Sequence, residues 1–259
     1  MRQDFAIVNF LKSAQRGSPL LCWSCVVMVV GMAICFALPL FDARLIAGVS
    51  VWEKPAKFFL ALIVHGITVA WAISLLQRPA RGVKVATFIL VAAGWFEMAY
   101  MIFRAARGEA SHFNVSDTLG AILYPLMGLA AISLTATSAF IGWRAWQQRA
   151  SGLMIVAAGL GLGLGAALGT VAGAYLSSQT SHWIGGDFSD ATGLGFFHWS
   201  TTGGDLRVAH FIGLHAAQAL PLSALSRNKF AVYGLAFGIV ALASATFCAA
   251  LIGTPLLRG

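Results

Sequence analysis

Seven stretches of this chain are long and apolar enough to cross a membrane. A span needs roughly 20 mostly apolar residues to cross about 30 Å of hydrocarbon. Backbone groups in lipid must be satisfied within the segment, and the alternation of a β-barrel strand is absent, so each stretch is predicted to be a helix. The stretches are Pro19–Leu40, Pro55–Leu76, Val83–Phe103, Leu119–Trp143, Leu153–Leu176, Leu206–Leu225 and Phe230–Leu251. The sequence therefore predicts an all-α bundle of seven transmembrane helices.

The composition excludes the soluble classes of protein. Of 259 residues, 59% are hydrophobic and only 10% are charged, against about 25% charged in soluble domains. A soluble globular domain, a disordered chain and a disulfide-built secreted module are all excluded. The four cysteines are expected to be reduced. The net charge of +8 would suggest nucleic acid in a soluble protein, but here membrane topology explains it and no nucleic-acid partner is expected.

The basic residues predict the orientation of the bundle, because cytoplasmic segments of membrane proteins are enriched in Lys and Arg. With the N-terminus inside, the inner segments hold ten basic residues and one acid, Asp4, a net charge of +9. The outer segments and outer span ends hold seven basic residues and eight acids, a net charge of −1. The inner basic residues are Arg2, Lys12, Arg16, Arg78, Arg81, Lys84, Arg144, Arg149, Arg227 and Lys229. We therefore expect the N-terminus inside and the C-terminus outside.

The chain divides into a short interfacial segment and one membrane domain. Residues 1–18 are expected to form an amphipathic helix on the membrane surface, and residues 19–259 a single transmembrane domain. The long outer loop 177–205 contains no Lys or Arg and could fold over the outer mouth as a lid. Four glycines at four-residue spacing in the fifth span would let another helix approach closely, including one from a second copy in a homo-oligomer. They are Gly161, Gly165, Gly169 and Gly173.

Ionisable residues inside the spans gather at one depth. Such residues are costly in lipid and are functional candidates by default. At 1.5 Å per residue, His65, His215 and Glu97 lie about 15, 13 and 10 Å below the outer ends of their spans. On the sixth span Arg207, His210, His215 and Gln218 fit one arc of about 140°. All six histidines lie in the outer half or the outer loops. The pattern predicts a buried polar site that opens outward.

Metal-dependent chemistry is the first hypothesis for this site. Imidazoles with a carboxylate are the ligand set of catalytic zinc, and His65, His210 and His215 are the candidate metal ligands beside Glu97. Arg104 or Arg207 would stabilise an oxyanion or a phosphate. Because the site opens outward at lipid depth, we expect a lipid, a lipid-linked substrate or a small molecule from the outer side. Catalytic roles are predicted for Glu97, Arg104, Asp205, Arg207 and Gln218, and substrate binding for Lys57, Arg107, His112 and Asn114.

Three alternatives remain open. A b-type haem would use His65 and His215 as axial ligands from two helices. A non-enzymatic ligand-binding or assembly role would need only the outward pocket. A purely structural network would pair Glu97 with Arg104. Transport is disfavoured, because the inner half of the bundle has no ionisable relay.

Two motifs resemble a known group of proteins. They are Ser111-His-Phe-Asn114 and Gly203-Gly-Asp-Leu-Arg207, the latter followed by His210-Phe-x-Gly-Leu-His215-x-x-Gln218. The pairing resembles an uncharacterised family of bacterial polytopic (seven-span) integral membrane proteins. The resemblance implies a bacterial inner (cytoplasmic) membrane and no known activity. It also implies one functional unit, made of Lys57, Glu97, His112, Asn114, Asp205, Arg207, His210, His215 and Gln218, and it adds nothing for His65.

Overall fold

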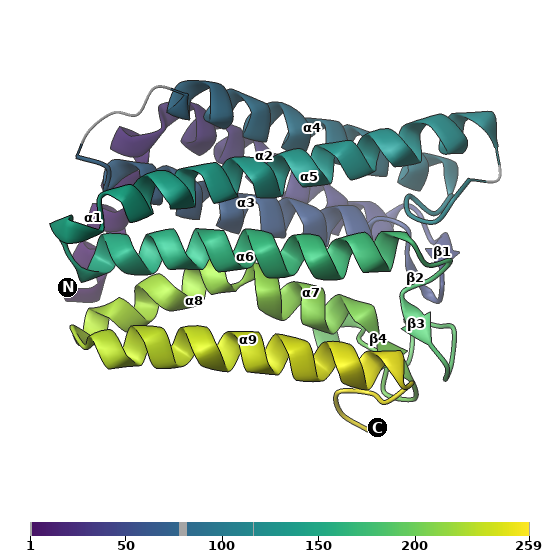
Figure 1. Ribbon diagram of the computed structural model, residues 1–259. Helices are drawn as coiled ribbons and strands as arrows, with labels where there is room; N and C mark the ends of the chain where they lie inside the picture. Colours follow the sequence, from purple (N-terminus) through teal and green to yellow (C-terminus); the bar gives the residue numbers. More distant parts are fainter. Residues whose placement is uncertain (1, 78–81, 116, 259) are drawn as a thin grey trace.

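The computed structural model describes residues 2–77, 82–115 and 117–258 of an almost entirely helical chain (Figure 1). The helices are α1 (Arg2–Gly17), α2 (Pro19–Ala37), α3 (Glu53–Ser74), α4 (Val83–Arg107), α5 (Thr118–Gln147), α6 (Leu153–Ser177), α7 (Leu206–Leu214), α8 (Ala216–Ser223) and α9 (Lys229–Leu251). Single 3-10 turns are η1 (Leu38–Leu40), η2 (Arg149–Ser151), η3 (Gly195–Phe197) and η4 (Ala224–Ser226). The prediction of an all-α fold is confirmed. Arg78 and Arg81, two of the predicted inner arginines, lie outside the described residues.

The membrane-spanning segments agree with the apolar stretches. Within the described chain, six helices are long and apolar enough to cross a membrane, namely α2, α3, α4, α5, α6 and α9. The pair α7 and α8 also qualifies together, but it is bent by 42°, so the total is seven if this pair forms one span.

The predicted sixth span is broken at His215, which lies between the two helices. Pro221 in α8 cannot donate a backbone hydrogen bond to the carbonyl of Ala217, and its ring crowds that carbonyl. Periodicity alone does not reveal such a break, because the apolar pattern continues across it.

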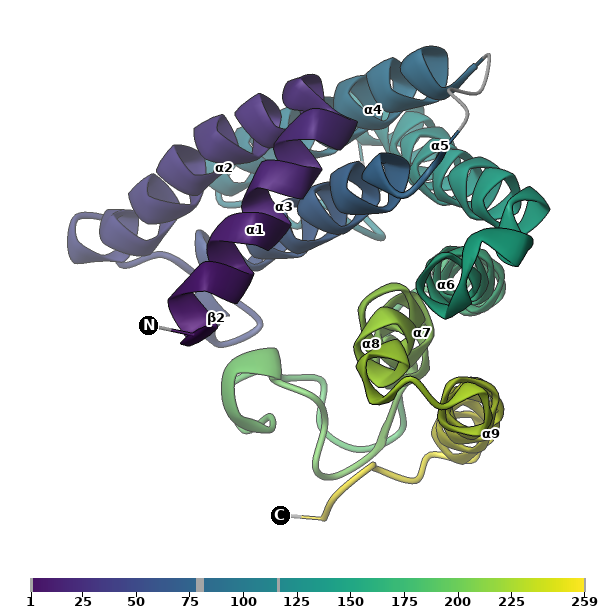
Figure 2. The same ribbon diagram turned by 90° about the vertical axis from the view of Figure 1, so that its left-hand side faces the viewer.

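The helices follow one another around an arc (Figure 2). α5 packs between α4 and α6, α6 packs against α7 and α8, and both of these contact α9. α1 and α2 pack against α3. Apolar side chains on the outer surfaces remain exposed, for example Val30 on α2 and Phe237 on α9, as expected of helices that face lipid.

The glycine stripe of α6 packs inside the chain. A Cβ atom on Gly161 would lie 2.7 Å from the carbonyl oxygen of Ala216, and one on Gly165 would lie 3.1 Å from that of Leu214. Gly169 faces the Leu214 side chain, and Gly173 faces the ring of His210. The face on which a homo-oligomer contact was expected is therefore filled by α7 and α8 of the same chain.

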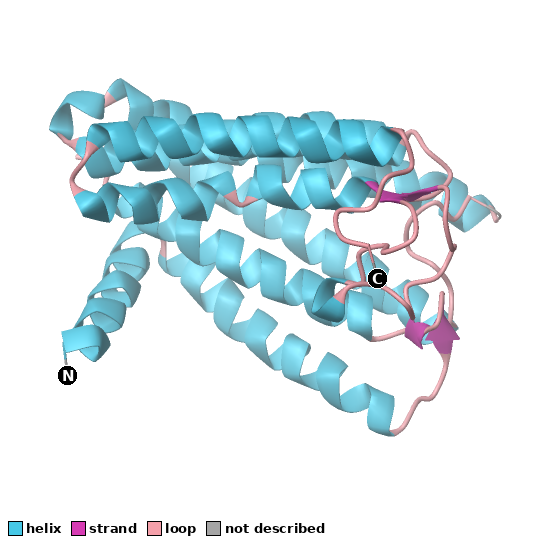
Figure 3. Cartoon of the chain, turned by 90° about the horizontal axis from the view of Figure 1, so that it is seen from below, coloured by secondary structure: helices cyan, strands magenta, loops and turns pink. Residues whose placement is uncertain are grey.

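The long loop before α7 folds back over one end of the bundle. β3 (Trp183–Ile184) pairs with β4 (Gly204–Asp205), and β1 (Leu45–Ile46) pairs with β2 (Val49–Ser50) nearby (Figure 3). The amide of Asp190 donates to the carbonyl of Ala47 at 2.8 Å, which ties this loop to the β1–β2 turn. This end also holds the C-terminus, whereas α1 lies at the opposite end (Figure 1). We refer to it below as the outer end, after the orientation that the sequence predicts.

Candidate functional site

Lys54, in the first turn of α3, lies among charged groups from several segments at the outer end. It interacts electrostatically with Glu97 of α4, Asp190 of the long loop and Arg207 of α7. The positive charge of Lys54 also acts on His112, in the loop between α4 and α5. Lys54 is nevertheless an exposed residue whose amine has no hydrogen-bond or ion-pair partner among the described residues.

Glu97 faces Lys54 from the middle of α4. The residue is only 4% exposed, and its Oε1 atom has no hydrogen-bond partner among the described residues. A buried carboxyl oxygen without a partner is rare in folded proteins. The ion pair of Glu97 with Arg104, expected if the network were purely structural, is not formed, because Arg104 binds other carboxylates.

Arg104 anchors the loop between α4 and α5. Its guanidinium is fully buried and forms ion pairs with Glu109 and, at 3.1 Å, with Asp117, and it donates to the hydroxyl of Tyr100. Asp117 also caps α5 by accepting from the amide of Gly120 at 2.6 Å. Hydrogen bonds from Arg104 hold the pKa of Asp117 below its ordinary value. A fully covered guanidinium cannot touch a ligand, so this geometry gives Arg104 a structural position.

Arg107 and Asn114 belong to the same loop. Arg107 pairs with Glu109 at 2.9 Å and lies over the ring of Phe103. Asn114 donates to the carbonyl of Ala110 at 3.2 Å. Both residues were predicted to bind substrate, and both contribute here to the shape of the loop that positions His112.

His112 is held by rings from two helices. Its imidazole packs against Phe58 of α3 and Tyr124 of α5, with ring centroids 5.7 and 6.2 Å away, and lies 3.1 Å from the hydroxyl of Ser111. Burial lowers the pKa of His112 well below its ordinary value, and the charge of Lys54 lowers it further. At neutral pH the ring is therefore uncharged and can both donate and accept a hydrogen bond.

Asp205 and Arg207 lock the long loop onto α7. Asp205 is 3% exposed, accepts from the backbone amides of Ser200 and Arg207, and pairs with the Arg207 guanidinium at 2.7 Å. Arg207 also pairs with Asp190 at 2.9 Å and donates to the carbonyl of His198. The two predicted catalytic residues thus fix the long loop at the start of α7.

The three predicted metal ligands have separate partners. His65 lies 2.8 Å from the hydroxyl of Ser138, His210 lies 2.9 Å from the carbonyl of Gly169, and His215 stacks on Phe211 with 2.8 Å to its carbonyl. Among the residues that the structure describes, no group of three or more His, Cys, Asp or Glu side chains could hold a metal ion. The predicted metal site is therefore not shown by the described side chains, and five-residue spacing turns the two rings of the sixth span apart.

Gln218 lies beyond the break, in α8, and donates to the hydroxyl of Thr68 at 3.1 Å. It joins α8 to α3 near the level where His65 joins α3 to α5. None of these contacts favours the haem alternative.

Buried polar atoms without hydrogen bonds gather at the outer end. In the described chain they include Glu97 Oε1, His182 Nε2, Trp183 Nε1, Asp190 Oδ1 and His198 Nδ1. Asp190 Oδ1 lies 3.5 Å from His182 Nε2, within range of an ion pair but without hydrogen-bond geometry. Asp190 Oδ1 also lies 2.9 Å from the Arg207 guanidinium, so this atom has a charged neighbour although it has no hydrogen bond.

Lys54 is the functional candidate that the sequence patterns did not identify. Its neighbour Lys57, predicted to bind substrate, pairs with Glu53 at 2.5 Å and lies over the ring of Phe196. Glu53 also contacts His198 of the long loop. The i,i+4 spacing of Glu53 and Lys57 is typical of an ion pair on one helix face, and this signal could have indicated that Lys54 was the free amine.

The neutral state of His112 predicts a pH dependence of stability. The unfolded histidine titrates near pH 6.5, while burial lowers the pKa of His112 in the folded protein. Below about pH 6.5 the unfolded chain binds more protons, so stability falls as the pH decreases through this value. We expect the melting temperature to fall between pH 7 and pH 5, and to fall less in His112→Gln. An equal decline in both proteins would contradict the neutral, buried imidazole. Carboxylates whose pKa values are lowered in the folded protein affect the pH dependence of stability only nearer pH 4.

No family model, no curated protein and no solved structure matches this chain.

Proposed function

We propose that the protein binds, at its outer end, a membrane-resident or small-molecule ligand that carries an anionic group. Lys54 is the cationic anchor, His112 and His182 can donate hydrogen bonds, and Glu97 can accept a hydrogen bond from a hydroxyl or amine of the same ligand. The observation that carries the proposal is the electrostatic interaction between Lys54, an exposed residue without a partner among the described residues, and Glu97, whose buried Oε1 atom also lacks one. Binding sites combine a partly apolar wall with a few convergent polar groups, and Phe58 and Tyr124 supply such a wall.

A lipid or lipid-linked ligand fits the position of this site. Glu97 lies within a candidate membrane span, while Lys54 lies at the outer end of another. A phosphate or carboxylate at head-group level would reach Lys54, with its apolar part remaining in lipid. The donor set does not fit a metal ion, so the proposal includes no metal.

Acid–base catalysis on the bound ligand is a second candidate, favoured by Glu97. A buried carboxyl beside a lysine is an arrangement used for general acids and bases. In this role Lys54 would hold the anionic group, and Glu97 would exchange a proton with an adjacent hydroxyl. Simple ligand binding and acid–base catalysis both require that the anionic group of the ligand binds at Lys54.

The proposal includes an orientation and a location. The distribution of Lys and Arg supports an inner N-terminus and an outer C-terminus, so that the site faces away from the cytoplasm across a bacterial inner membrane. A reporter fused after Gly259 is expected to be active only outside the cytoplasm. Cytoplasmic activity would contradict this orientation.

Labelling with pyridoxal 5′-phosphate tests the binding site. The aldehyde of this reagent condenses with a free amine and releases water, and borohydride then reduces the imine to a stable product. Because the reagent carries a phosphate, we expect Lys54 to react at least about tenfold faster than Lys57, whose amine pairs with Glu53. The two lysines share one helix and one membrane face, so Lys57 is an internal control. Equal labelling, or labelling of Lys57 alone, would contradict the proposal.

A further inference from the structure

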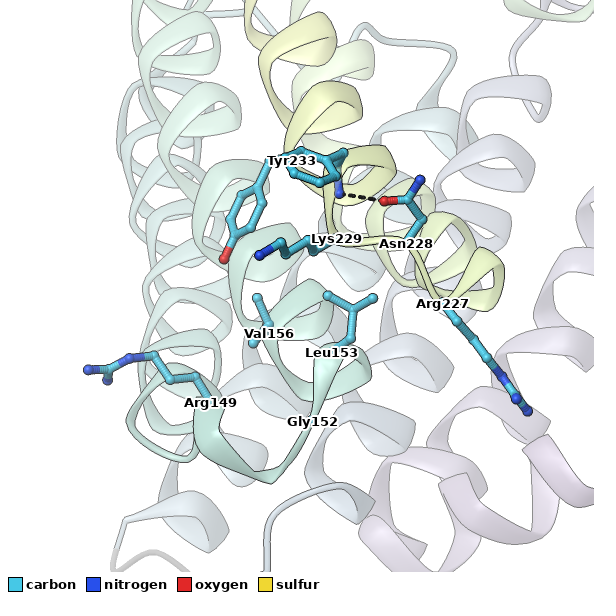
Figure 4. A pocket seen from close by; sticks show the side chains of 9 residues that line it. Arg149, Gly152, Leu153, Val156, Arg227, Asn228, Lys229 and Tyr233 are labelled. Carbon is cyan, nitrogen blue, oxygen red and sulfur yellow. Dashed lines mark hydrogen bonds between the residues drawn. The ribbon is translucent and has the colours of Figure 1, made fainter.

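A shallow, open cavity lies at the end of the bundle opposite the candidate site. It has a volume of about 690 Å³ and lies between the beginnings of α6 and α9 (Figure 4). Its lining includes Arg149, Gly152, Arg227, Lys229 and Tyr233. The candidate ligand site does not involve any of these residues.

The charges around this cavity all have one sign. Arg149, Arg227 and Lys229 line it, no acidic residue does, and none of the three forms an ion pair with a described residue. Figure 4 shows the Lys229 amine and the Tyr233 hydroxyl pointing into the central space, while the guanidinium groups of Arg149 and Arg227 extend outward on opposite sides. The cavity therefore has a cationic centre and a cationic rim.

The backbone adds partial positive charge around this cavity. α6 begins after Gly152 without a side-chain cap, and neither α6 nor α9 has an acidic residue in its first turn. The amides of a helix N-terminus carry partial positive charge and attract anions. Asn228 caps α9 through the amide of Phe230 at 2.9 Å, so the uncapped amides are those of α6.

The walls of the cavity are apolar. Leu153 and Val156 of α6 face Phe230 and Tyr233 of α9, and Phe230 is 74% exposed. Arg149 lies over the ring of Trp146, an aromatic residue of the kind that marks the membrane–water interface. A small inorganic anion would use the charges alone, whereas a phospholipid would use the charges and the apolar walls together.

We propose that this cavity binds the head group of an anionic phospholipid. Its phosphate would lie against Lys229 and the Tyr233 hydroxyl, its acyl chains would follow the apolar faces of α6 and α9, and the two arginines would attract it from the rim. Basic pockets at the ends of transmembrane helices favour anionic lipids in this way. The proposal is independent of the function proposed for the outer end.

Native mass spectrometry of the full-length protein tests this site. We expect phosphatidylglycerol to bind at least about tenfold more tightly than phosphatidylcholine. The triple variant Arg149→Gln, Arg227→Gln, Lys229→Gln is expected to lose this preference. The matched control Lys12→Gln, Arg16→Gln, Lys84→Gln removes three charges from the same end outside the cavity and is expected to keep it.

Three outcomes would overturn the proposal. An equal loss in both triple variants would show a general effect of surface charge. Equal binding of the two lipids by the wild-type protein would show that no anionic head group is selected. Displacement of phosphatidylglycerol by millimolar inorganic phosphate would assign the cavity to a free anion. The single variant Lys229→Gln is also compared with the wild type in neutral detergent. If the two proteins have equal melting temperatures, weaker lipid binding by the variant reflects the lost amine and not a loss of folding.

Discussion

Replacing both carboxylates that hold Arg104, in the variant Glu109→Gln with Asp117→Asn, is expected to lower the melting temperature in detergent by about 10 °C or more. Arg104 is fully buried, and these two side chains are its ionic partners. Without them a buried guanidinium loses its counter-charges, and α5 loses the charged cap on Gly120. Thermal unfolding followed by circular dichroism measures the shift.

The variant Arg104→Met is expected to be less destabilised. It removes the buried charge and leaves two carboxylates whose side chains are 28% and 42% exposed, so water can solvate them. Asp187→Asn, which removes an exposed carboxylate of the long loop, is the control and should unfold as the wild type does. If Arg104→Met unfolded at a lower temperature than the double variant, the described role of Arg104 would be wrong.

Gly161→Ala is expected to destabilise the protein by about 1–3 kcal/mol. The added Cβ atom would lie 2.7 Å from the carbonyl oxygen of Ala216 and 3.2 Å from the Cα atom of Ala217. Both are backbone atoms, which cannot rotate away, so α6 would have to separate from α8. The change is measured as the loss of unfolding free energy in a denaturant titration in mixed micelles.

Gly163, two residues away on the same helix, is the matched control. A Cβ atom there meets nothing within 4 Å. Gly163→Ala is therefore expected to stabilise the helix by about 0.4–1 kcal/mol, because alanine loses less conformational entropy on folding. A loss of unfolding free energy in Gly161→Ala together with a gain in Gly163→Ala would support packing of α6 on α7 and α8 within one chain. A loss of dimer in Gly161→Ala with unchanged monomer stability would instead indicate a contact between copies.

Hydropathy predicted the helical segments well, because lipid forces almost every spanning residue to be apolar and every backbone group to be bonded locally. Each predicted stretch contains a helix, and Asp117 caps α5 as its position suggests. The break at His215 was not predicted. The apolar pattern continues across it, so hydropathy reads one span where the chain forms two helices.

The candidate site was only partly predictable. Helix rise predicts a common depth for Glu97, His65 and His215, but depth does not fix which face of each helix meets which neighbour. His65, His210 and His215 lie within hydrogen-bond distance of the Ser138 hydroxyl, the Gly169 carbonyl and the Phe211 carbonyl, respectively. Lys54 was overlooked because it stands at a span end, where lysines commonly serve as interfacial anchors.

We propose that the protein binds an anionic group at Lys54, close to Glu97. The most direct measurement is the protection of Lys54 from pyridoxal phosphate by glycerol 3-phosphate, with glycerol as the uncharged control and Lys57 as the internal reference. We predict concentration-dependent protection of Lys54 alone, with none from glycerol, and altered protection in Glu97→Gln. Equal protection of both lysines, or none at any concentration that leaves the protein folded, would contradict the account.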